Sequence, residues 1–496
     1  MFRKILIANR GEIAVRVIRA ARELGIRSVA VYSEADRESL PVKLADEAVC
    51  IGPPPTQESY LHIPRIISAC QIANVDAVHP GYGFLSENFR FAEACEATGF
   101  RFIGPPPEVI RRMGDKSSAK AAMRAAGVPV IPGSEGPVAS PEEALRLAGE
   151  VGYPILLKAR EGGGGKGMRI AREPASIAAA YETAAAEARA AFGNSELYLE
   201  KLIERPRHIE VQLAGDARGR VAHFWERDCS IQRRHQKLIE EAPSPALDSA
   251  ARRELGRVAA KGAAQIGYRS LGTMEFLLDE QGRVYFMEMN TRLQVEHGVT
   301  EEVTGVDLVK LQILLAMDEP LPMKQSEIRL QGHAIECRIN AEDPAANFRG
   351  RPGTVSEFYP PGGPGVRMDT HLYAGYIVPP HYDSLIGKIV ARAGTRAEAI
   401  ERMKRALSEL VIEGVTTTAP FHAGVMEDAS FRAGHCDTSF VESYLERAQA
   451  ALARETVTPP VREEPAIAQE PAIVPEAVTT PASGSANEGP SSAPPS

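Results

Sequence analysis

Long apolar stretches are missing from this sequence of 496 residues. No run approaches the roughly 18 consecutive apolar residues that a membrane-spanning helix needs. The apolar segment near the start, Ile5 to Ala8, is too short for the core of a signal peptide. With 44% hydrophobic and 25% charged residues, the composition is that of an ordinary soluble protein. We therefore expect a cytoplasmic protein without a membrane partner.

Closely spaced cysteines are also absent. The six cysteines are scattered, without the close pairs typical of a zinc site or a redox couple, and the eleven histidines include no His-Glu-x-x-His pattern. We expect reduced thiols and no dedicated transition-metal site. The net charge of −8 works against binding to a phosphate backbone, so nucleic acid is not an expected partner.

Two common nucleotide-binding signatures are missing as well. No G-x-G-x-x-G pattern follows the first predicted strand, at residues 4–9, where a dinucleotide-binding fold would carry it. The glycine-rich stretch at 162–167 is not a Walker A loop, because Lys166 is followed by Gly167 rather than by Ser or Thr. A nucleotide site, if present, must be built in another way.

The length predicts about three domains at about 150 residues each. Residues 1–113 alternate short apolar strands with amphipathic helices, which predicts a doubly wound α/β domain with a parallel sheet. We expect a second unit over 114–330 and a third over 331–447, so that the fold combines α/β and α+β parts. Residues 448–496, rich in Pro, Ala, Glu and Ser, are predicted to be a disordered tail.

The glycine run at 162–167 lies between two predicted strands. Such a hairpin can close over a nucleotide, because backbone N–H groups without a neighbouring Cβ can approach phosphates. Lys158, on the strand that leads into the loop, could reach the same phosphates. A plain surface turn is the alternative, which the ordering entropy of four successive glycines disfavours.

Residues 285–296 alternate polar and apolar side chains. As one extended strand, this segment would place on one face Glu288, Asn290, Arg292, Gln294 and Glu296. A strand at 272–277 can pair with it and bring Glu275 near Glu288. Two carboxylates and an amide oxygen suit Mg²⁺, which prefers oxygen ligands. The alternative is the solvated face of an antiparallel strand, and the nearby glycine loop favours the functional interpretation.

The segment 226–237 is dense in cations within an acidic chain. It could hold an anion such as bicarbonate or a transferring phosphoryl group. A solvated charged face is the alternative, and Cys229 is interpreted as structural.

Together these segments resemble the ATP-grasp biotin carboxylases, from Lys4 to about Leu445. The likeness also includes residues 7–12, 79–88, 113–116 and 336–342. It implies a central ATP-grasp domain with a mobile glycine-rich lid at 131–203, followed by an α+β domain. The implied protein is the biotin carboxylase subunit of an acetyl-CoA, another acyl-CoA or a pyruvate carboxylase, and the resemblance does not distinguish among these acceptors.

The resemblance implies a set of site residues. The nucleotide would contact Lys116, Lys158, Gly164, Gly165, Glu200, Lys201, Ile203, His208, Gln232 and His235. Mg²⁺ or Mn²⁺ would be held by Glu275, Glu288 and Asn290. Bicarbonate and biotin would contact Lys237, Arg292, Gln294, Val295, Arg338 and Tyr82. The implied catalytic residues are Glu296, Arg292, Arg338 and Lys237.

The implied reaction starts when Glu296 deprotonates bicarbonate, which attacks the γ-phosphorus of ATP to give carboxyphosphate. Carboxyphosphate releases CO₂ and phosphate, the phosphate deprotonates biotin, and Arg338 offsets the charge of the biotin enolate. The family's attachment sequence Ala-Met-Lys-Met is absent, so biotin is expected on a separate carrier protein. The other expected partners are a carboxyltransferase subunit and a second copy of the chain in a homodimer.

One departure from the family pattern is Gly298, where proline is common; the loop there is expected to place Glu296 less firmly. Two rival interpretations stay open. One is another ATP-grasp ligase, such as half of a carbamoyl-phosphate synthase or an amino-acid ligase, and the other is a nucleotide-binding scaffold without turnover. Glu296, Arg292 and Arg338 favour biotin carboxylation, because binding ATP requires none of them.

Overall fold

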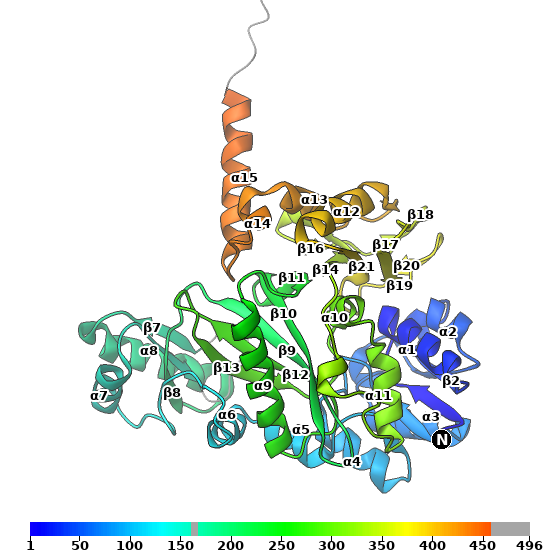
Figure 1. Cartoon of the computed structure of the whole chain (residues 1–496), viewed down its shortest axis with the longest axis horizontal. Coiled ribbons are helices and arrows are strands. Elements are labelled where there is room, and N and C mark those ends of the chain that lie inside the picture. The colour runs from blue at the N-terminus through cyan, green and yellow to red at the C-terminus, as the bar shows by residue number, and fades with distance from the viewer. Residues whose placement is uncertain (160–166, 458–496) are drawn as a thin grey trace, which may run out of the picture. The chain divides into compact units, whose positions relative to one another are not determined.

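The computed structural model describes residues 1–159 and 167–457. Residues 1–445 form one compact unit, and residues 446–496 form a second. Within the first unit, the regions predicted as three domains pack against one another (Figure 1). No helix in the described part of the chain has the length and apolar character needed to cross a membrane.

The N-terminal region is a five-stranded parallel sheet in the order β3-β2-β1-β4-β5. Its strands are β1 (Lys4–Ile7), β2 (Arg27–Ser33), β3 (Glu47–Gly52), β4 (Ala77–His79) and β5 (Arg101–Phe102). Ile5 and Ile7 pack on the side of α1 (Gly11–Glu23), whereas Leu6 packs on the side of α3 (Ile63–Ala73) and α4 (Phe89–Ala97). Because alternate strand residues face opposite helices, the predicted doubly wound domain is confirmed.

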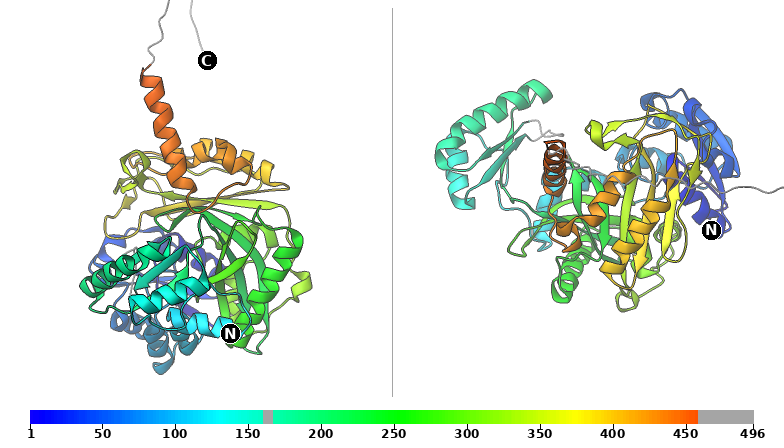
Figure 2. Two further views of the ribbon diagram at one scale, coloured as in Figure 1. Left: turned by 90° about the vertical axis from the view of Figure 1, so that its left-hand side faces the viewer. Right: turned by 90° about the horizontal axis from the view of Figure 1, so that it is seen from above.

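An eight-stranded sheet dominates the rest of the unit, in the order β13-β12-β9-β10-β11-β14-β21-β19. Its strands are β9 (Arg207–Gly215), β10 (Val221–Arg233), β11 (Gln236–Ala242), β12 (Ser270–Leu278), β13 (Val284–Asn290), β14 (His333–Asn340), β19 (Val366–Thr370) and β21 (Leu385–Ala393). Neighbouring strands are antiparallel, and α9 (Ser249–Gln265) packs along β9 and β10 (Figures 1 and 2). The pairing of β11 with β14 carries the sheet across the expected boundary at 330, so residues from both regions share one surface.

The predicted lid contains a separate three-stranded sheet in the order β7-β6-β8, with two helices packed on it. These elements are β6 (Ile155–Ala159), β7 (Met168–Ala171), β8 (Leu197–Lys201), α7 (Pro141–Val151) and α8 (Ile177–Phe192). β6 and β7 pair antiparallel, with Lys158 opposite Met168, so the predicted hairpin is confirmed on both sides of the glycine run. Gly164 and Gly165 lie outside the described residues.

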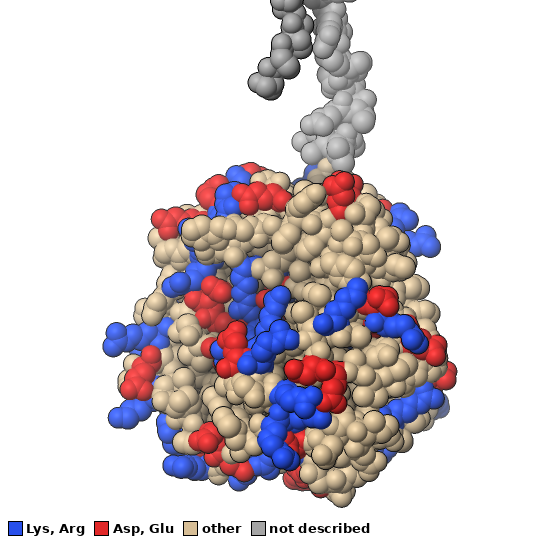
Figure 3. All heavy atoms as spheres, turned by 90° about the vertical axis from the view of Figure 1, so that its right-hand side faces the viewer, with Lys and Arg blue, Asp and Glu red and all other residues tan. Residues whose placement is uncertain are grey.

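The C-terminal region adds α12 (Arg396–Glu409) and α13 (Ala419–Glu427) over β14 and β21. Further helices are α5 (Pro107–Gly114), α6 (Lys116–Ala125), α10 (His297–Thr304), α11 (Leu308–Ala316) and α15 (Phe440–Val457). α15 continues helically through residues 448–457, where the composition predicted disorder, and residues 458–496 lie outside the described part. Acidic and basic side chains are interspersed on the face that Figure 3 shows.

Candidate active site

A pair of carboxylates lies on the hairpin of β12 and β13. Glu275 is directly opposite Glu288, as the sequence predicted. The Glu288 carboxylate is half-buried and has no hydrogen-bond or ion-pair partner among the described residues. Burial and the adjacent Glu275 raise the pKa of Glu288, although Lys116 at the start of α6 opposes this shift. Glu288 is therefore a partly buried carboxylate without an ion-pair partner among the described residues.

The prediction that residues 285–296 form one strand is wrong. β13 ends at Asn290, and after a turn the chain enters α10 at His297. Glu87, from the N-terminal region, accounts for the turn: its carboxylate accepts from the Thr291 backbone N–H at 3.0 Å and from Arg292 Nε at 2.8 Å. An acceptor from a distant part of the chain therefore replaces the partner that a continuing strand would have supplied.

The turn nevertheless gathers the predicted side chains. Arg292 donates to Asn290 Oδ1 at 3.2 Å and to Gln294 Oε1 at 3.1 Å. Asn290 Nδ2 and Gln294 Nε2 both donate to Glu275 Oε1, at 2.8 and 3.2 Å. The residues predicted on one strand face thus meet around Glu275 through the turn.

Lys237, on β11, is the cation at the centre of the site. Its Nζ lies 2.6 Å from Glu296 Oε1, 2.6 Å from Glu210 Oε2 and 3.0 Å from Glu275 Oε1. Burial alone would favour the neutral amine, but these three carboxylates outweigh it and raise the pKa of Lys237 well above its ordinary value. Lys237 is therefore a fixed positive charge.

Glu296 is fully buried between two cations, at the residue before α10. Its Oε2 accepts from Arg338 NH2 at 2.9 Å, while Oε1 accepts from Lys237. Burial would raise the pKa of Glu296, yet Lys237 and Arg338 hold that pKa well below its usual range. Arg338 Nε also donates to Glu240 Oε1 at 2.6 Å, which fixes the guanidinium. The carboxylate is thus ionised and held in one place.

The other cations of the basic segment at 226–237 do not contact the Glu296 carboxylate directly. Arg227 is fully buried, and its guanidinium is committed to Glu210 and to three neutral acceptors. Those acceptors are Gln212 at 2.7 Å, Thr300 at 2.9 Å and Thr273 at 3.2 Å. His235 is exposed in the β10–β11 turn, and Gln232 is buried on β10 opposite Lys237. Only Lys237 of this segment's cations contacts Glu296.

Arg227→Met is expected to destabilise the protein. It breaks a buried ion pair, which costs about 3–5 kcal/mol, and it leaves Glu210 with Lys237 alone and three buried neutral acceptors without their donor. Urea unfolding measures this loss. Arg283→Met, which removes a mostly exposed arginine paired with Asp279, should change stability far less. Equal small effects for the two variants would contradict the structural role of Arg227.

Glu200 on β8, one of the predicted nucleotide residues, pairs with two lysines. Lys158 of β6 and Lys120 of α6 both pair with its carboxylate, the latter at 2.8 Å. These two lysines hold the pKa of Glu200 below its usual value against the effect of burial. Lys120 was missed by the sequence analysis. Two cations and one carboxylate on facing elements can bind a polyphosphate if Glu200 releases a lysine.

The other predicted nucleotide residues have varied surroundings. Lys201 donates to the carbonyl oxygens of Gly152, at 3.1 Å, and Tyr153, so it holds the lid's own backbone. Ile203 follows β8 and is half-buried, and Lys116 is exposed at the start of α6. His208 Nε2 lies 3.1 Å from Glu275 Oε2. His208 therefore belongs with the carboxylate pair.

The donor set fits a magnesium ion. Glu275, Glu288 and Asn290 offer carboxylate and amide oxygens, and Glu288 has no cation of its own to lose. Among the described residues, His208, Glu210 and Glu275 also come close enough to one another to share a metal. Lys237 already contacts Glu210 and Glu275, which favours the oxygen set that includes Glu288.

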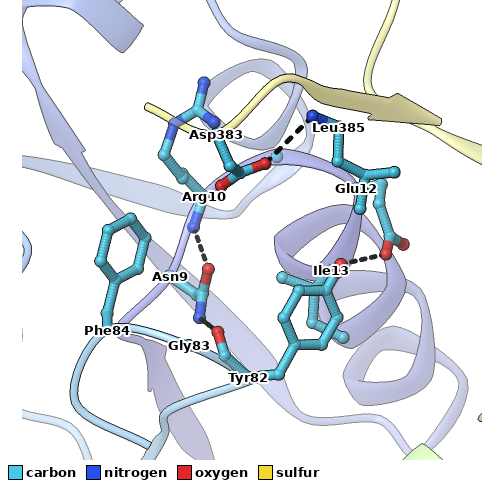
Figure 4. A pocket seen from close by; sticks show the side chains of 10 residues that line it. Asn9, Arg10, Glu12, Ile13, Tyr82, Gly83, Phe84, Asp383 and Leu385 are labelled. Atoms are coloured by element: carbon cyan, nitrogen blue, oxygen red, sulfur yellow. Dashed lines mark hydrogen bonds between the residues drawn. The ribbon is translucent and has the colours of Figure 1, made fainter. Parts of the chain in front are cut away.

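Tyr82, in the N-terminal region, contacts Glu12 and Asn9 (Figure 4). Its hydroxyl donates to Glu12 Oε1, and its backbone carbonyl accepts from Asn9 Nδ2 at 2.7 Å. Tyr82, Glu12 and Asn9 line a small cavity of about 90 Å³, and Phe84 and Asp383 line it as well. Val295 lies beside this network, because its carbonyl oxygen accepts from the buried Lys388.

Gly298 lies in the first turn of α10, so the expected loop at this position is wrong. A Cβ there would lie 2.9 Å from Glu336 Oε2 and 3.2 Å from Val390 Cγ2. Glycine thus lets α10, which follows Glu296 directly, pack closely on β14 and β21.

An antiparallel sheet that carries paired carboxylates, together with a small glycine-hairpin sheet that carries lysine and glutamate, defines an ATP-grasp ligase. Family models match three successive parts of the chain: Biotin carboxylase, N-terminal domain (residues 1–110), Carbamoyl-phosphate synthase L chain, ATP binding domain (115–324), and Biotin carboxylase C-terminal domain (336–443). The synthase-type match is confined to the middle of the chain, between the two biotin carboxylase matches.

Similar proteins extend over nearly the whole first unit. A biotin carboxylase of Nostoc sp. is 58% identical over 441 residues, 89% of this chain and 99% of that protein. Biotin carboxylase 1 of Bacillus subtilis is 54% identical over 445 residues, 90% of this chain and 99% of that protein. The chain therefore belongs to the biotin carboxylase family, and its reaction is the ATP-dependent carboxylation of biotin, the first half-reaction of biotin-dependent carboxylases.

Solved structures agree with this assignment. A biotin carboxylase–β,γ-ATP complex from Campylobacter jejuni has a TM-score of 0.84 and 51% identity, covering 89% of this chain and 99% of that one. The biotin carboxylase domain dimer of Hydrogenobacter thermophilus 2-oxoglutarate carboxylase, in complex with MgADP and bicarbonate, has a TM-score of 0.83 and 51% identity, covering 90% and 98%. ATP and magnesium are thus the cofactors of the reaction.

Proposed function

We propose that this chain carboxylates biotin presented by a separate carrier protein, by way of carboxyphosphate, with Glu296 as the base that deprotonates bicarbonate. The observation that carries the proposal is the position of Glu296, buried and ionised between Lys237 and Arg338. A base held by two cations lies where an anionic substrate would also be attracted.

Bicarbonate would bind by sharing those cations. An anion between Lys237 and Arg338 withdraws part of their interaction from Glu296, which raises the proton affinity of the carboxylate at the moment when it must accept a proton. Arg292 and Gln294 offer further donors, and the Val295 backbone lies beside them. The oxygen that loses its proton then attacks the γ-phosphorus of ATP.

The nucleotide would lie between the lid and the eight-stranded sheet. Lys116, Lys158, Lys201, Ile203, His208, Gln232 and His235 would contact it, together with Glu200 and the glycines 164 and 165. Magnesium, or manganese, would neutralise phosphate charge when held by Glu275, Glu288 and Asn290. The protein's own part is to position the phosphates and to supply fixed charge.

Biotin would be carboxylated beside Arg338 and Tyr82. Carboxyphosphate breaks down to CO₂ and phosphate, the phosphate takes the proton from biotin N1′, and N1′ then bonds to the CO₂ to give carboxybiotin. Arg338 offsets the negative charge that develops on the ureido oxygen. We further propose a biotin carboxyl carrier protein and a carboxyltransferase subunit as partners, a cytoplasmic location, and a homodimer. The dimer described for the Hydrogenobacter domain supports the last point.

Free biotin is expected to accelerate ADP release by the purified protein in the presence of ATP, Mg²⁺ and bicarbonate, because the second step consumes the intermediate. A coupled assay for ADP measures the rate, and the same assay without bicarbonate is the control. ADP release that is independent of both biotin and bicarbonate would favour a different ATP-grasp ligase.

A further inference from the structure

We infer that Lys388 is a positioning residue for bicarbonate activation: its buried ammonium holds the Val295 carbonyl and so fixes the turn that presents Glu296. The inference rests on the proposed role of Glu296. Lys388 lies on β21, outside every segment that the sequence analysis singled out.

Lys388 is buried and contacts both the turn before α10 and helix α1. The residue is 0% exposed, and its Nζ donates to the Val295 carbonyl oxygen and lies 3.4 Å from Glu12 Oε1. Val295 immediately precedes Glu296, which is the residue before α10. One ammonium group therefore ties the backbone next to the base to α1 of the N-terminal region and to β21.

Lys388 also connects the side chain of Tyr82 with the backbone next to Glu296. Glu12 accepts from the Tyr82 hydroxyl, and Figure 4 shows these two side chains pointing toward each other. Across the strands, Lys388 is directly opposite Arg338 on β14. A continuous series of contacts thus runs from Tyr82, through Glu12 and Lys388, to the backbone of Val295 and to Glu296.

The ammonium stays charged despite its burial. Desolvation lowers the pKa of Lys388, but Glu12, Glu336 and Asp369 outweigh it and raise that pKa above the ordinary value. Both carboxylate oxygens of Glu336 are buried without a hydrogen-bond partner among the described residues. Glu336 therefore does not replace the Val295 carbonyl oxygen as a hydrogen-bond acceptor of Lys388. A main-chain carbonyl is thus a principal hydrogen-bond acceptor of a cation that is costly to bury, which is expected when backbone position matters.

The test compares Lys388→Met with a double variant, Lys388→Met/Glu336→Gln, and with Lys388→Arg. Burial raises the pKa of Glu336 well above its usual range, and the glutamine of the double variant cannot ionise, so no negative charge can appear at this buried position when the ammonium of Lys388 is removed. We expect kcat/KM for bicarbonate to fall about 100-fold in both Met variants, as a displacement of about 1 Å at a reacting group does. The dissociation constant of ATP, measured by calorimetry, should change less than about twofold, because Lys388 contacts no nucleotide residue.

Lys388→Arg keeps the charge but changes its reach, so kcat/KM for bicarbonate should fall about tenfold, between wild type and Met. Lys4→Met is the matched control, since Lys4 also donates to a backbone carbonyl, Ala73 O at 2.7 Å, and pairs with a glutamate, Glu47 at 2.9 Å. It lies on β1 away from Glu296, and its kinetic constants should equal those of wild type.

An unchanged kcat/KM for bicarbonate in the folded double variant would overturn the inference, as would equal losses for bicarbonate and ATP. If the Met variants do not fold, Lys388→Arg decides, and a wild-type value for it overturns the inference. A wild-type protein without bicarbonate-dependent ATP cleavage would instead refute the proposed function.

Discussion

Glu296→Gln is expected to lower kcat for bicarbonate-dependent ATP cleavage by about 10²–10⁴-fold, the usual contribution of a general base. Glutamine keeps the shape of the side chain but cannot accept the proton. ATP affinity should stay within about twofold of wild type, because Glu296 contacts Lys237 and Arg338 and none of the lysines around Glu200. Steady-state ADP release and ATP calorimetry together measure the two effects.

Folding should survive this change, since Lys237 keeps Glu210 and Glu275 as partners and Arg338 keeps Glu240. Glu241→Gln is the matched control. Glu241 is a buried glutamate on the same strand as Lys237 and pairs instead with Arg396, at 2.6 Å, and His333, at 2.7 Å. Wild-type turnover in both variants, or a loss of ATP binding in Glu296→Gln, would mean that the base lies elsewhere.

The carboxylate pair could be predicted because the period of a strand is short and local. Glu275 and Glu288 are joined by a single hairpin, so their alternation fixed both the pairing and the face. The end of β13 could not be predicted in the same way. It depends on Glu87, whose position relative to Thr291 is set by the packing of the N-terminal region and leaves no mark on residues 285–296.

Several residues of the site were missed for a related reason. Lys388, Glu240 and Glu87 reach the site through contacts with residues far away in the sequence, which no local pattern reports. Glu210 did leave a signal: on β9 it alternates with His208 and Gln212 as polar residues facing one side, the same pattern that drew attention to residues 285–296. Applying the two-residue period to every predicted strand would have found it.

The helix at 448–457 shows a limit of composition. The tail as a whole has the Pro and Ser content of a disordered segment, but residues 446–455 consist mainly of Ala, Arg, Glu and Leu. These are strong helix formers that extend α15 from Phe440 to Val457. Local propensity, rather than the average over the tail, sets where the helix ends.

Glu288→Gln is expected to lower Mg²⁺-dependent ATP cleavage by at least about 10²-fold, because a metal ligand that carries charge contributes several kcal/mol of transition-state stabilisation. Stability in the absence of metal should not fall. Glu288 has no hydrogen-bond or ion-pair partner among the described residues, and burial and Glu275 outweigh the attraction of Lys116, so a neutral amide removes a net unfavourable interaction and breaks no hydrogen bond or ion pair. Activity as a function of Mg²⁺ concentration, and urea unfolding in EDTA, measure the two quantities.

The opposite signs of these effects separate a metal-binding role from a structural one. A structural carboxylate stabilises the fold. A metal-binding carboxylate without its ion instead destabilises the metal-free protein, and the protein gains stability only when Mg²⁺ and nucleotide bind. MgATP should therefore raise the melting temperature of wild type more than that of Glu288→Gln. Glu280→Gln, at the turn of the same hairpin and paired with Arg205, is the control that should behave as wild type. Full activity of Glu288→Gln at saturating Mg²⁺, or a clear loss of its metal-free stability, would place the ion at another set of ligands.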